Sequence, residues 1–246
     1  MQKEWEGIPE FMRTPEVCTY WEVLDKKKGQ LALKRIFDFV LAAIMLVILA
    51  VPMAVIAVII KLDSKGPVFY RQERVTAYGK HFRIHKFRTM VQNADKIGTT
   101  VTVNHDSRIT KVGAKLRCFR LDELPQLLDV FVGDMSFVGP RPEAVKYVEK
   151  YRPEYNATLL VPAGITSLAS IYYKDEAKLL DGVDDIDKIY IEKILPGKMY
   201  YNLKGMAQFS FWSDIKVMFM TVFAVLGKEY KGDYKGSVQE KEGIEI

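Results

Sequence analysis

The chain has 246 residues, of which 49% are hydrophobic and 27% are charged, a balance that excludes an intrinsically disordered protein. It has only two cysteines, Cys18 and Cys118, and their wide separation excludes a disulfide scaffold and a zinc site built on paired cysteines. The formal net charge of +5 suits anionic lipids and phosphate ligands equally well, so charge alone does not identify a partner.

The N-terminal part of the chain is predicted to contain a membrane helix. Residues 1–33 read as an N-terminal extension, in which residues 1–30 are expected to lie on the surface or to be poorly ordered, and a membrane helix is expected over residues 34–62. Within it, residues 39–60 contain no charge, no glycine and no polar side chain, and would form a helix of about 33 Å, enough to cross a bilayer core. A buried core helix would normally carry a polar stripe, and a secretory signal would begin nearer the N-terminus. The sequence therefore predicts membrane insertion.

Pro52 and the flanking charges bear on how this helix inserts. Pro52 divides the apolar run into 13 and 8 residues, and proline is expected to kink a helix. Both flanks are basic, and Lys and Arg accumulate on the cytoplasmic side of membranes. A re-entrant helix that enters, bends at Pro52 and leaves on the same side satisfies both flanks, and this is our prediction. A kinked single span is the alternative, since many spanning helices contain proline.

The remainder, residues 63–227, is predicted to form a catalytic domain, followed by a disordered tail at 228–246. Alternation over residues 68–74 and 80–87 predicts a β-hairpin, and a loop is expected at 162–164. Residues 209–226 are apolar and aromatic and predict a helix, either in the core or, as we favour, in the membrane interface with Trp212 at headgroup level. Further helical patterns cover residues 114–130, 143–152, 174–180 and 187–205.

An acidic pair, Asp122 and Glu123, is the first candidate for chemistry. The leucines between residues 121 and 128 have helical spacing, and Pro125 belongs in a first turn, so a helix is expected to start close to the pair. Helix N-termini attract phosphate, and adjacent carboxylates can hold Mg²⁺ beside a diphosphate. Plain N-capping by Asp122 is the alternative, and the local pattern alone favours it.

Basic residues lie on both sides of this pair. Arg117 and Arg120 precede it, and Arg141 stands between Pro140 and Pro142. Prolines on both sides restrict the backbone and would fix the direction of the arginine, and a fixed guanidinium suits bidentate contact with phosphate. A surface salt bridge on a stiff loop is an equal alternative.

Together these features resemble the bacterial sugar transferases, the small monotopic phosphoglycosyl transferases, over about residues 34–226. Several motifs in the right order make the resemblance more specific than any one of them. In chain order, the motifs are Lys-Arg-Ile-Phe-Asp at 34–38, residues 66–74, Lys-Phe-Arg-Thr-Met at 86–90, Leu-Asp-Glu-Leu-Pro-Gln-Leu at 121–127, residues 133–143 and Gly-Ile-Thr at 164–166.

The resemblance implies a reaction and a cofactor. The aspartate of the Asp-Glu pair is the family nucleophile, so Asp122 would attack the β-phosphorus of a UDP-sugar, release UMP and hold the sugar phosphate covalently. A polyprenol phosphate would then accept it. The resemblance also implies Mg²⁺ at Asp122 and Glu123, with Glu123 binding the metal or preparing the acceptor. Arg117 and Arg141 match family arginines that would bind phosphate oxygens.

Weaker candidates and departures accompany this match. Lys86 and Arg88 lie in a separate family motif and are further phosphate-binding candidates, and Lys174 stands where many members have an arginine. Val51 replaces the serine that usually precedes the membrane-helix proline, so a shallower bend is expected. Asn202 aligns loosely with a family aspartate, which puts a metal or structural role there in doubt.

The resulting prediction is an α+β, mostly helical enzyme with a re-entrant helix, a hairpin and interfacial helices, on the cytoplasmic face of the bacterial inner membrane. Its expected role is the first membrane step of capsule, exopolysaccharide or other glycan assembly. The expected partners are a UDP-sugar, undecaprenyl phosphate and membrane lipids, without nucleic acid, and a homo-oligomer is left open. The alternatives are a glycosyltransferase that releases UDP and a non-enzymatic membrane-anchored module that binds anionic lipid or nucleic acid.

Overall fold

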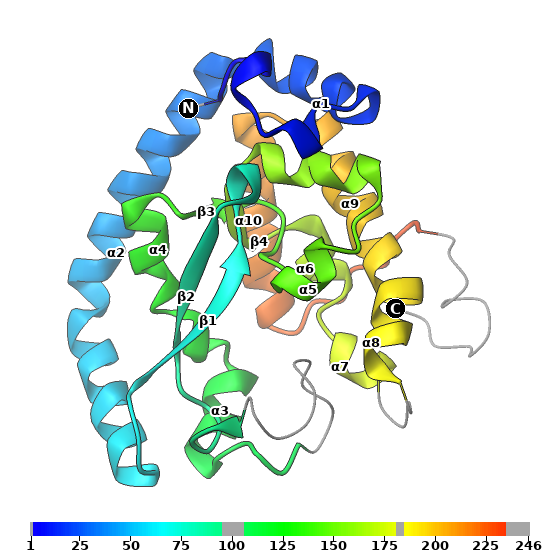
Figure 1. Cartoon of the computed structure of the whole chain (residues 1–246). Coiled ribbons are helices and arrows are strands. Elements are labelled where there is room, and N and C mark those ends of the chain that lie inside the picture. Colours follow the sequence, from blue (N-terminus) through cyan, green and yellow to red (C-terminus); the bar gives the residue numbers. More distant parts are fainter. Residues whose placement is uncertain (1, 95–105, 181–184, 235–246) are drawn as a thin grey trace.

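The computed structural model describes residues 2–94, 106–180 and 185–234 and shows a mostly helical chain with two small sheets in that part (Figure 1). The strands are β1 (Phe69–Val75), β2 (His81–Phe87), β3 (Met135–Val138) and β4 (Ala163–Thr166). The α-helices are α1 (Pro15–Asp25), α2 (Lys28–Asp63), α3 (Lys111–Cys118), α4 (Gln126–Val132), α5 (Val145–Val148), α6 (Leu168–Tyr172), α7 (Glu176–Leu179), α8 (Ile186–Ile189), α9 (Leu195–Ala207) and α10 (Phe211–Val225). The shorter helical segments are the 3₁₀ turns η1 (Trp5–Gly7), η2 (Glu10–Met12), η3 (Ala77–Gly79), η5 (Leu121–Glu123) and η6 (Pro153–Leu160), and the π-helical η7 (Tyr190–Ile194).

Helix α2 runs along one side of the molecule and contains the predicted apolar run (Figure 1). Its 36 residues begin six residues before the predicted start at 34 and continue through Pro52 as one helix. By length and composition it could cross a membrane, and only 6% of its most apolar 18-residue stretch is buried inside the protein. The re-entrant bend at Pro52 and the side on which each end lies stay predictions.

The first turns of α2 are fixed to the rest of the chain by polar contacts of Lys34 and Asp38, which are buried, and of Arg35, which is partly exposed. Lys34 Nζ lies 2.6 Å from Asp214 Oδ2 on α10, and Arg35 donates to the carbonyls of Val130 and Phe131 at the end of α4. One turn later, Asp38 accepts a 2.7 Å hydrogen bond from the Ser136 hydroxyl on β3. The Lys-Arg-Ile-Phe-Asp motif at 34–38 therefore attaches the long helix to α4, β3 and α10.

The predicted β-hairpin is confirmed. Strands β1 and β2 pair antiparallel, with Tyr70 opposite Lys86 and Glu73 opposite Arg83. The turn passes through Tyr78 at φ 58° and Gly79 at φ 73°, left-handed conformations in which a glycine costs least. Because side chains alternate along a strand, one face of this hairpin carries Tyr70 together with Lys86.

Strands β3 and β4 form a parallel pair that the sequence did not predict. The expected loop at 162–164 is wrong in part, because residues 163–166 extend and pair with residues 135–138. The pair needs two glycines, since a Cβ on Gly164 would lie 2.1 Å from the backbone nitrogen of Gly139. This close approach holds the loop after β3, which contains Arg141, against the start of β4.

Several predicted helices are shorter or broken. The helix expected over 114–130 is interrupted, because Arg120 adopts a left-handed conformation with φ 56° between α3 and α4. Only residues 145–148 of the predicted 143–152 are α-helical. Residues 176–179 form α7, and the pattern over 187–205 corresponds to α8, η7 and α9.

The two ends of the described chain pack against the domain. In the N-terminal extension, Met12, Val17 and Leu24 are fully buried and join a cluster with residues of η6 and α9. At the other end, Asp233 pairs with Lys204 on α9. The rest of the predicted tail, residues 235–246, lies outside the described residues.

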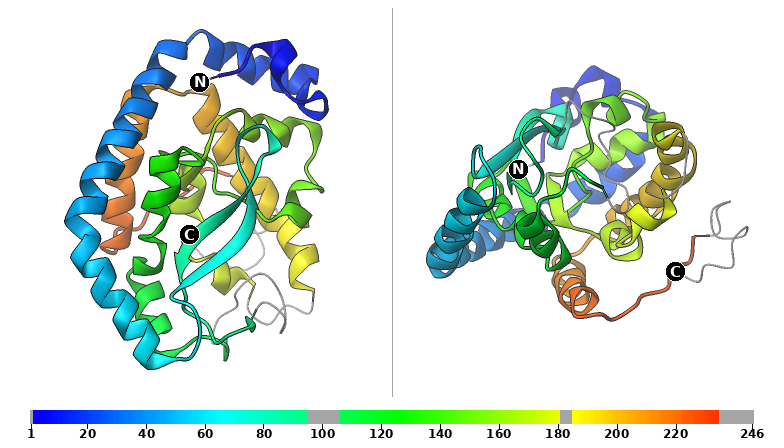
Figure 2. Two further views of the ribbon diagram at one scale, coloured as in Figure 1. Left: turned by 60° about the vertical axis from the view of Figure 1, so that its left-hand side comes forward. Right: turned by 90° about the horizontal axis from the view of Figure 1, so that it is seen from below.

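Helix α10 begins beside α2, where the rings of Phe211 and Phe37 lie 5.5 Å apart (Figure 2). Its inner side is buried at Val217, whereas Trp212 and Phe219 are 76% and 62% exposed. The helix predicted over residues 209–226 is therefore confirmed, while its location in a membrane interface stays a prediction.

Candidate active site

The acidic pair lies in the short turn η5 between α3 and α4. Arg120 reverses the chain with its left-handed backbone, and Glu123 N then donates to Arg120 O at 3.3 Å. Neither η5 nor α4 has a side-chain cap, so the structure contradicts the N-capping role considered for Asp122. With that role removed, two buried carboxylates stand side by side without a helix-capping function.

Glu123 is the centre of an ion-pair cluster. Its Oε1 lies 2.6 Å from Arg141 Nη2 and 2.9 Å from Lys86 Nζ, and its side chain is only 11% exposed. Burial by itself would raise the pKa of Glu123, yet Arg141 and Lys86 hold that pKa well below its usual range. Glu123 is therefore ionised, and it brings together two cations from distant parts of the sequence.

Asp122 differs from its neighbour in its surroundings. It is 9% exposed, and none of the described residues donates a hydrogen bond to its carboxylate. Burial raises the pKa of Asp122, while the charges of Lys86 and Arg117 act in the opposite direction. The Asp122 oxygens are not among the fully buried, unpartnered side-chain oxygens of the described residues, so they remain open to an approaching electrophile.

Two further candidates lie near the pair. Arg117, in the last turn of α3, is half-buried; burial lowers its pKa, and the charge of Asp122 opposes that shift. Lys174 is placed by its backbone, because its carbonyl accepts a 3.2 Å hydrogen bond from Arg120 Nη2. The structure thus brings Asp122, Glu123, Lys86, Arg141 and Arg117 together, with Lys174 on an adjoining segment.

Arg88 lies elsewhere. Its guanidinium is buried at the C-terminal end of α2, where it donates to the carbonyls of Ser64 at 2.6 Å and Lys65 at 2.9 Å. These bonds satisfy carbonyls that a helix end leaves unpaired. Arg88 therefore closes the long helix and is not brought to the acidic pair.

Arg74 belongs to the site but was missed. It lies four residue pairs along the hairpin from Tyr70 and Lys86, on the same face, and its Nη1 donates to Pro142 O at 3.4 Å. The period of two along the strand was the only signal in the sequence that could have found it. Arg74 supports the backbone beside Arg141.

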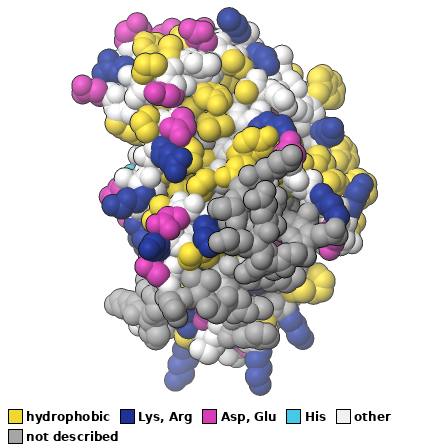
Figure 3. Space-filling view, turned by 90° about the vertical axis from the view of Figure 1, so that its right-hand side faces the viewer, with side chains coloured by type: hydrophobic (Ala, Val, Ile, Leu, Met, Phe, Trp, Pro, Cys, Tyr) yellow, Lys and Arg dark blue, Asp and Glu magenta, His cyan; other side chains and the backbone are white. Residues whose placement is uncertain are grey.

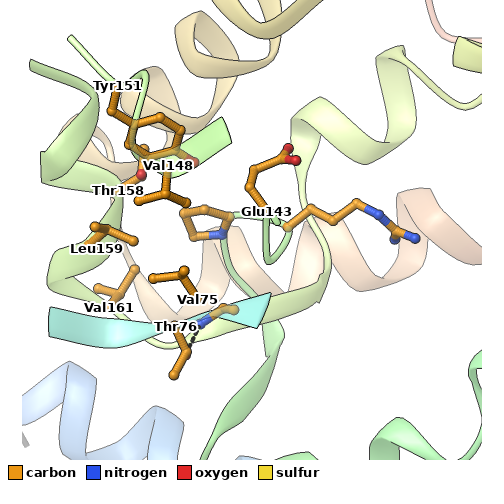
Figure 4. Close-up of a pocket in the computed structure, with 11 residues that line it drawn as sticks. Val75, Thr76, Glu143, Val148, Tyr151, Thr158, Leu159 and Val161 are labelled. Carbon is orange, nitrogen blue, oxygen red and sulfur yellow. Dashed lines mark hydrogen bonds between the residues drawn. The ribbon is translucent and has the colours of Figure 1, made fainter. Parts of the chain in front are cut away.

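Two cavities of the described chain are separate from the acidic pair. A cavity of about 10 Å³ lies behind the Arg141 loop, with Tyr151, Thr158 and Leu159 on one side and Glu143 on the other (Figure 4). It has room for one water molecule at most. A larger cavity of about 340 Å³ lies among α2, α9, α10 and β3, and neither Asp122 nor Glu123 lines it.

The carboxylates suit a divalent cation only in part. The described residues contain no group of three or more His, Cys, Asp or Glu side chains that could hold a metal ion. The pair can contribute Asp122 and the Glu123 Oε2, since the cations contact Oε1. Mg²⁺ commonly binds one or two carboxylates and takes its other ligands from substrate phosphates and water, so the pair fits that pattern.

Comparison with known proteins supports one family. The family model for bacterial sugar transferases matches residues 29–228. The chain is 40% identical over 196 residues to a UDP-glucose:undecaprenyl-phosphate glucose-1-phosphate transferase of Escherichia coli (strain K12), covering 78% of this chain and 39% of the relative. It is 36% identical over 197 residues to a UDP-N-acetylgalactosamine-undecaprenyl-phosphate N-acetylgalactosaminephosphotransferase of Aeromonas hydrophila, covering 79% and 44%. It is also 36% identical over 203 residues to an exopolysaccharide production protein PSS of Rhizobium leguminosarum bv. phaseoli, covering 80% and 96%.

These relatives differ in length. The chain spans about two fifths of the Escherichia coli and Aeromonas proteins but nearly all of the Rhizobium protein. The shared region extends from the start of α2 to just past α10. It therefore contains the long helix, the acidic pair and all the basic candidates.

Proposed function

The chain belongs to the bacterial sugar transferase family, and from this membership and the site geometry we propose that it transfers a sugar 1-phosphate from a UDP-sugar to a polyprenol phosphate such as undecaprenyl phosphate. The products would be UMP and a polyprenyl-diphospho-sugar, in the first membrane step of capsule, exopolysaccharide or other glycan assembly. The observation that supports this proposal best is the pair of carboxylates: Asp122 is buried and accepts no hydrogen bond from the described residues, and the neighbouring Glu123 forms ion pairs with Lys86 and Arg141.

The proposed reaction has two displacements at one phosphorus atom. A carboxylate oxygen of Asp122 attacks the β-phosphorus of the UDP-sugar, the bond from that phosphorus to the bridging oxygen breaks, and UMP leaves with the electron pair. A phosphate oxygen of the polyprenol phosphate then attacks the same phosphorus, and the Asp122 carboxylate leaves. A covalent intermediate divides one displacement between two anions into two easier steps.

The cations of the site would bind the phosphate oxygens. Arg141 and Lys86 now contact one oxygen of Glu123, so a substrate phosphate would share these cations with Glu123 or replace it. Arg117 lies on the Asp122 side, where charge develops during attack. We place Lys174 at the rim of the same group, whereas Arg88 is left out because its donors hold the end of α2.

Mg²⁺ is part of the proposal. Asp122 and Glu123 would hold it together with oxygens of the diphosphate, and when bound it would offset negative charge on the substrate. Glu123 is already ionised by its cations and is ready to act as a metal ligand at neutral pH. It would then also help to place the acceptor phosphate next to Asp122.

We propose that the molecule acts at the cytoplasmic face of the inner membrane. Its exposed large apolar side chains are concentrated on the long helix and α10, including Val47, Leu62, Trp212 and Phe219. On the described part of the face opposite α2, acidic and basic side chains are interspersed among hydrophobic ones (Figure 3). An apolar side that enters lipid and a charged side that faces water would place the acidic pair near the bilayer surface, where both substrates can meet.

The test is nucleotide release by membranes that contain the protein. Incubation with a panel of UDP-sugars and undecaprenyl phosphate should release UMP with one of them, and the active sugar identifies the donor. Release of UDP would indicate a glycosyltransferase, and no release with any sugar would favour a membrane-anchored binding module.

The role of Asp122 has its own variant. Asp122→Asn keeps the size of the side chain but removes the nucleophilic charge, and should lower turnover by more than about a thousandfold while folding and membrane binding persist. Asp134→Asn is the matched control, because Asp134 pairs with Lys80 at the surface and should change turnover by less than about twofold. Near-normal activity of Asp122→Asn would remove Asp122 as the nucleophile.

A further inference from the structure

A buried group of charged and hydroxyl side chains lies behind the loop that carries Arg141. Lys198 Nζ, on α9, is 2.9 Å from Glu143 Oε1 and 2.6 Å from the Tyr190 hydroxyl. Tyr190 in turn donates to Glu143 Oε1 at 2.8 Å. The side chains of Lys198 and Glu143 are 5% and 6% exposed, so water does not replace these contacts.

The same ammonium group reaches a second carboxylate. Glu176 Oε2, at the start of α7, lies 3.2 Å from Lys198 Nζ. The segment that carries Glu176 begins at Lys174, whose carbonyl is held by Arg120 from the side of the acidic pair. A single buried cation thus connects two segments that border the proposed phosphate site.

Such an arrangement is costly for stability alone. Burying charges is expensive, and apolar side chains of the same volume often stabilise a protein as well or better. Burial would lower the pKa of Lys198, but Glu143 and Glu176 raise it, so the ammonium stays charged at neutral pH. Unlike an apolar cluster, the ion group fixes the direction of the Glu143 side chain, because Lys198 and Tyr190 both contact its Oε1.

This constraint on Glu143 is transmitted to Arg141 by a short and stiff path. Only Pro142 separates Glu143 from Arg141, and proline fixes the backbone angle φ. Two further hydrogen bonds fix the same backbone, from Val75 N to Glu143 O at 3.1 Å and from Arg74 Nη1 to Pro142 O at 3.4 Å. The Glu143 side chain and these backbone contacts therefore act together to fix the residue that contacts Glu123.

From these contacts we infer that Lys198 is a positioning residue for catalysis: acting through Glu143 and with Tyr190, it directs Arg141 toward the phosphate of the substrate. This inference rests on the proposed function, in which Arg141 is a phosphate ligand. Lys198 itself does not touch the substrate, and neither Lys198 nor Tyr190 belongs to the motifs that identified the family.

The test is a double-mutant cycle between Lys198→Met and Arg141→Met, measured as kcat/KM for the UDP-sugar. Lys198→Met should lower kcat/KM at least tenfold in the wild-type background, mainly through KM. In the Arg141→Met background it should have almost no further effect, within about twofold, because there is no guanidinium left to direct. Equal losses in both backgrounds would show a merely structural role and overturn the inference.

Tyrosine variants keep the test valid if Lys198→Met does not fold. Tyr190→Phe removes only the hydroxyl that contacts both Lys198 and Glu143, while their direct ion pair remains, and it should give a smaller loss, about threefold to tenfold, with the same dependence on Arg141. Tyr147→Phe is the matched control, because its ring lies 4.5 Å from that of Tyr190 and its hydroxyl donates to Asp187 instead. An equal loss of kcat/KM in both tyrosine variants would contradict the inference.

Hydrogen exchange separates this inference from the proposed function. Backbone amides of residues 139–144 should exchange faster in Lys198→Met and Tyr190→Phe than in the wild type or Tyr147→Phe, whatever reaction is catalysed. If the loop loosens but no UDP-sugar yields UMP, the proposed function fails and the positioning of Arg141 stands. If UMP is released and depends on Arg141, while exchange is unchanged and the cycle is additive, the inference alone fails.

Discussion

Replacing Arg141 by methionine tests the electrostatics of the site through stability. Arg141→Met keeps most of the side-chain length but removes the partner that lies 2.6 Å from Glu123. Breaking a buried pair costs about 3–5 kcal/mol, whereas a hydrogen bond to a charged group contributes about 1.5–3 kcal/mol. Arg141 is 30% exposed and Lys86 stays with Glu123, so we expect a loss of about 2 kcal/mol at pH 7.

The pH dependence of this loss is the sharper part of the prediction. The pKa of Glu123 in the folded wild type lies well below its ordinary value of 4.5. The stability that this provides is fully present above pH 4.5 and is lost as the pH falls toward the folded pKa. The gap between wild type and Arg141→Met should therefore shrink as the pH falls below 4.5, by at most about 1.4 kcal/mol per pH unit.

The measurement is thermal unfolding in one detergent, followed by tryptophan fluorescence at pH 7 and pH 3.5. For a chain of this size, 2 kcal/mol corresponds to a shift of about 4–8 °C in the apparent midpoint. Arg71→Met is the control, because Arg71 is exposed and donates to the backbone carbonyl of Arg83, and a shift below about 2 °C at both pH values is expected. A gap for Arg141→Met that is the same at both pH values would refute the reasoning.

Two further predictions concern the fold and the membrane. Gly164→Ala should prevent or severely weaken folding, because the added Cβ would lie 2.1 Å from the backbone nitrogen of Gly139. Gly205→Ala is the control: its Cβ would have nothing within 4 Å, and the change should stabilise α9 by up to about 1 kcal/mol. The soluble yield in detergent and the unfolding midpoint would show both effects. For the topology, Cys18 in a Cys118→Ser background should escape a membrane-impermeant thiol reagent in intact spheroplasts and react only after lysis. In the Pro52→Ala variant, Cys18 should be labelled from outside in a fraction of the molecules. Strong labelling of Cys18 from outside without the Pro52 change would indicate a single span instead of a re-entrant helix.

The sequence by itself determined the features that depend on neighbouring residues. The apolar run of α2 and the alternation of the hairpin follow from local periodicity, and both appear in the structure. The order of the motifs identified the family and selected Asp122 and Glu123, because a pair of adjacent carboxylates is visible in one stretch of sequence. Arg141 was found in the same way, from the two prolines beside it.

Tertiary structure decided what each charged residue does. Lys86, Arg88 and Lys198 are equivalent cations in the sequence, yet the first contacts Glu123, the second closes α2 and the third is buried against Glu143. Partners for such side chains come from elements far away in the chain, and no local pattern records them. The same holds for the pairing of β3 with β4, which depends on a close backbone approach between Gly139 and Gly164. Short-range periodicity fixes helices and strands, whereas long-range contacts between buried polar groups fix the site, because only the folded chain brings those groups within hydrogen-bonding distance.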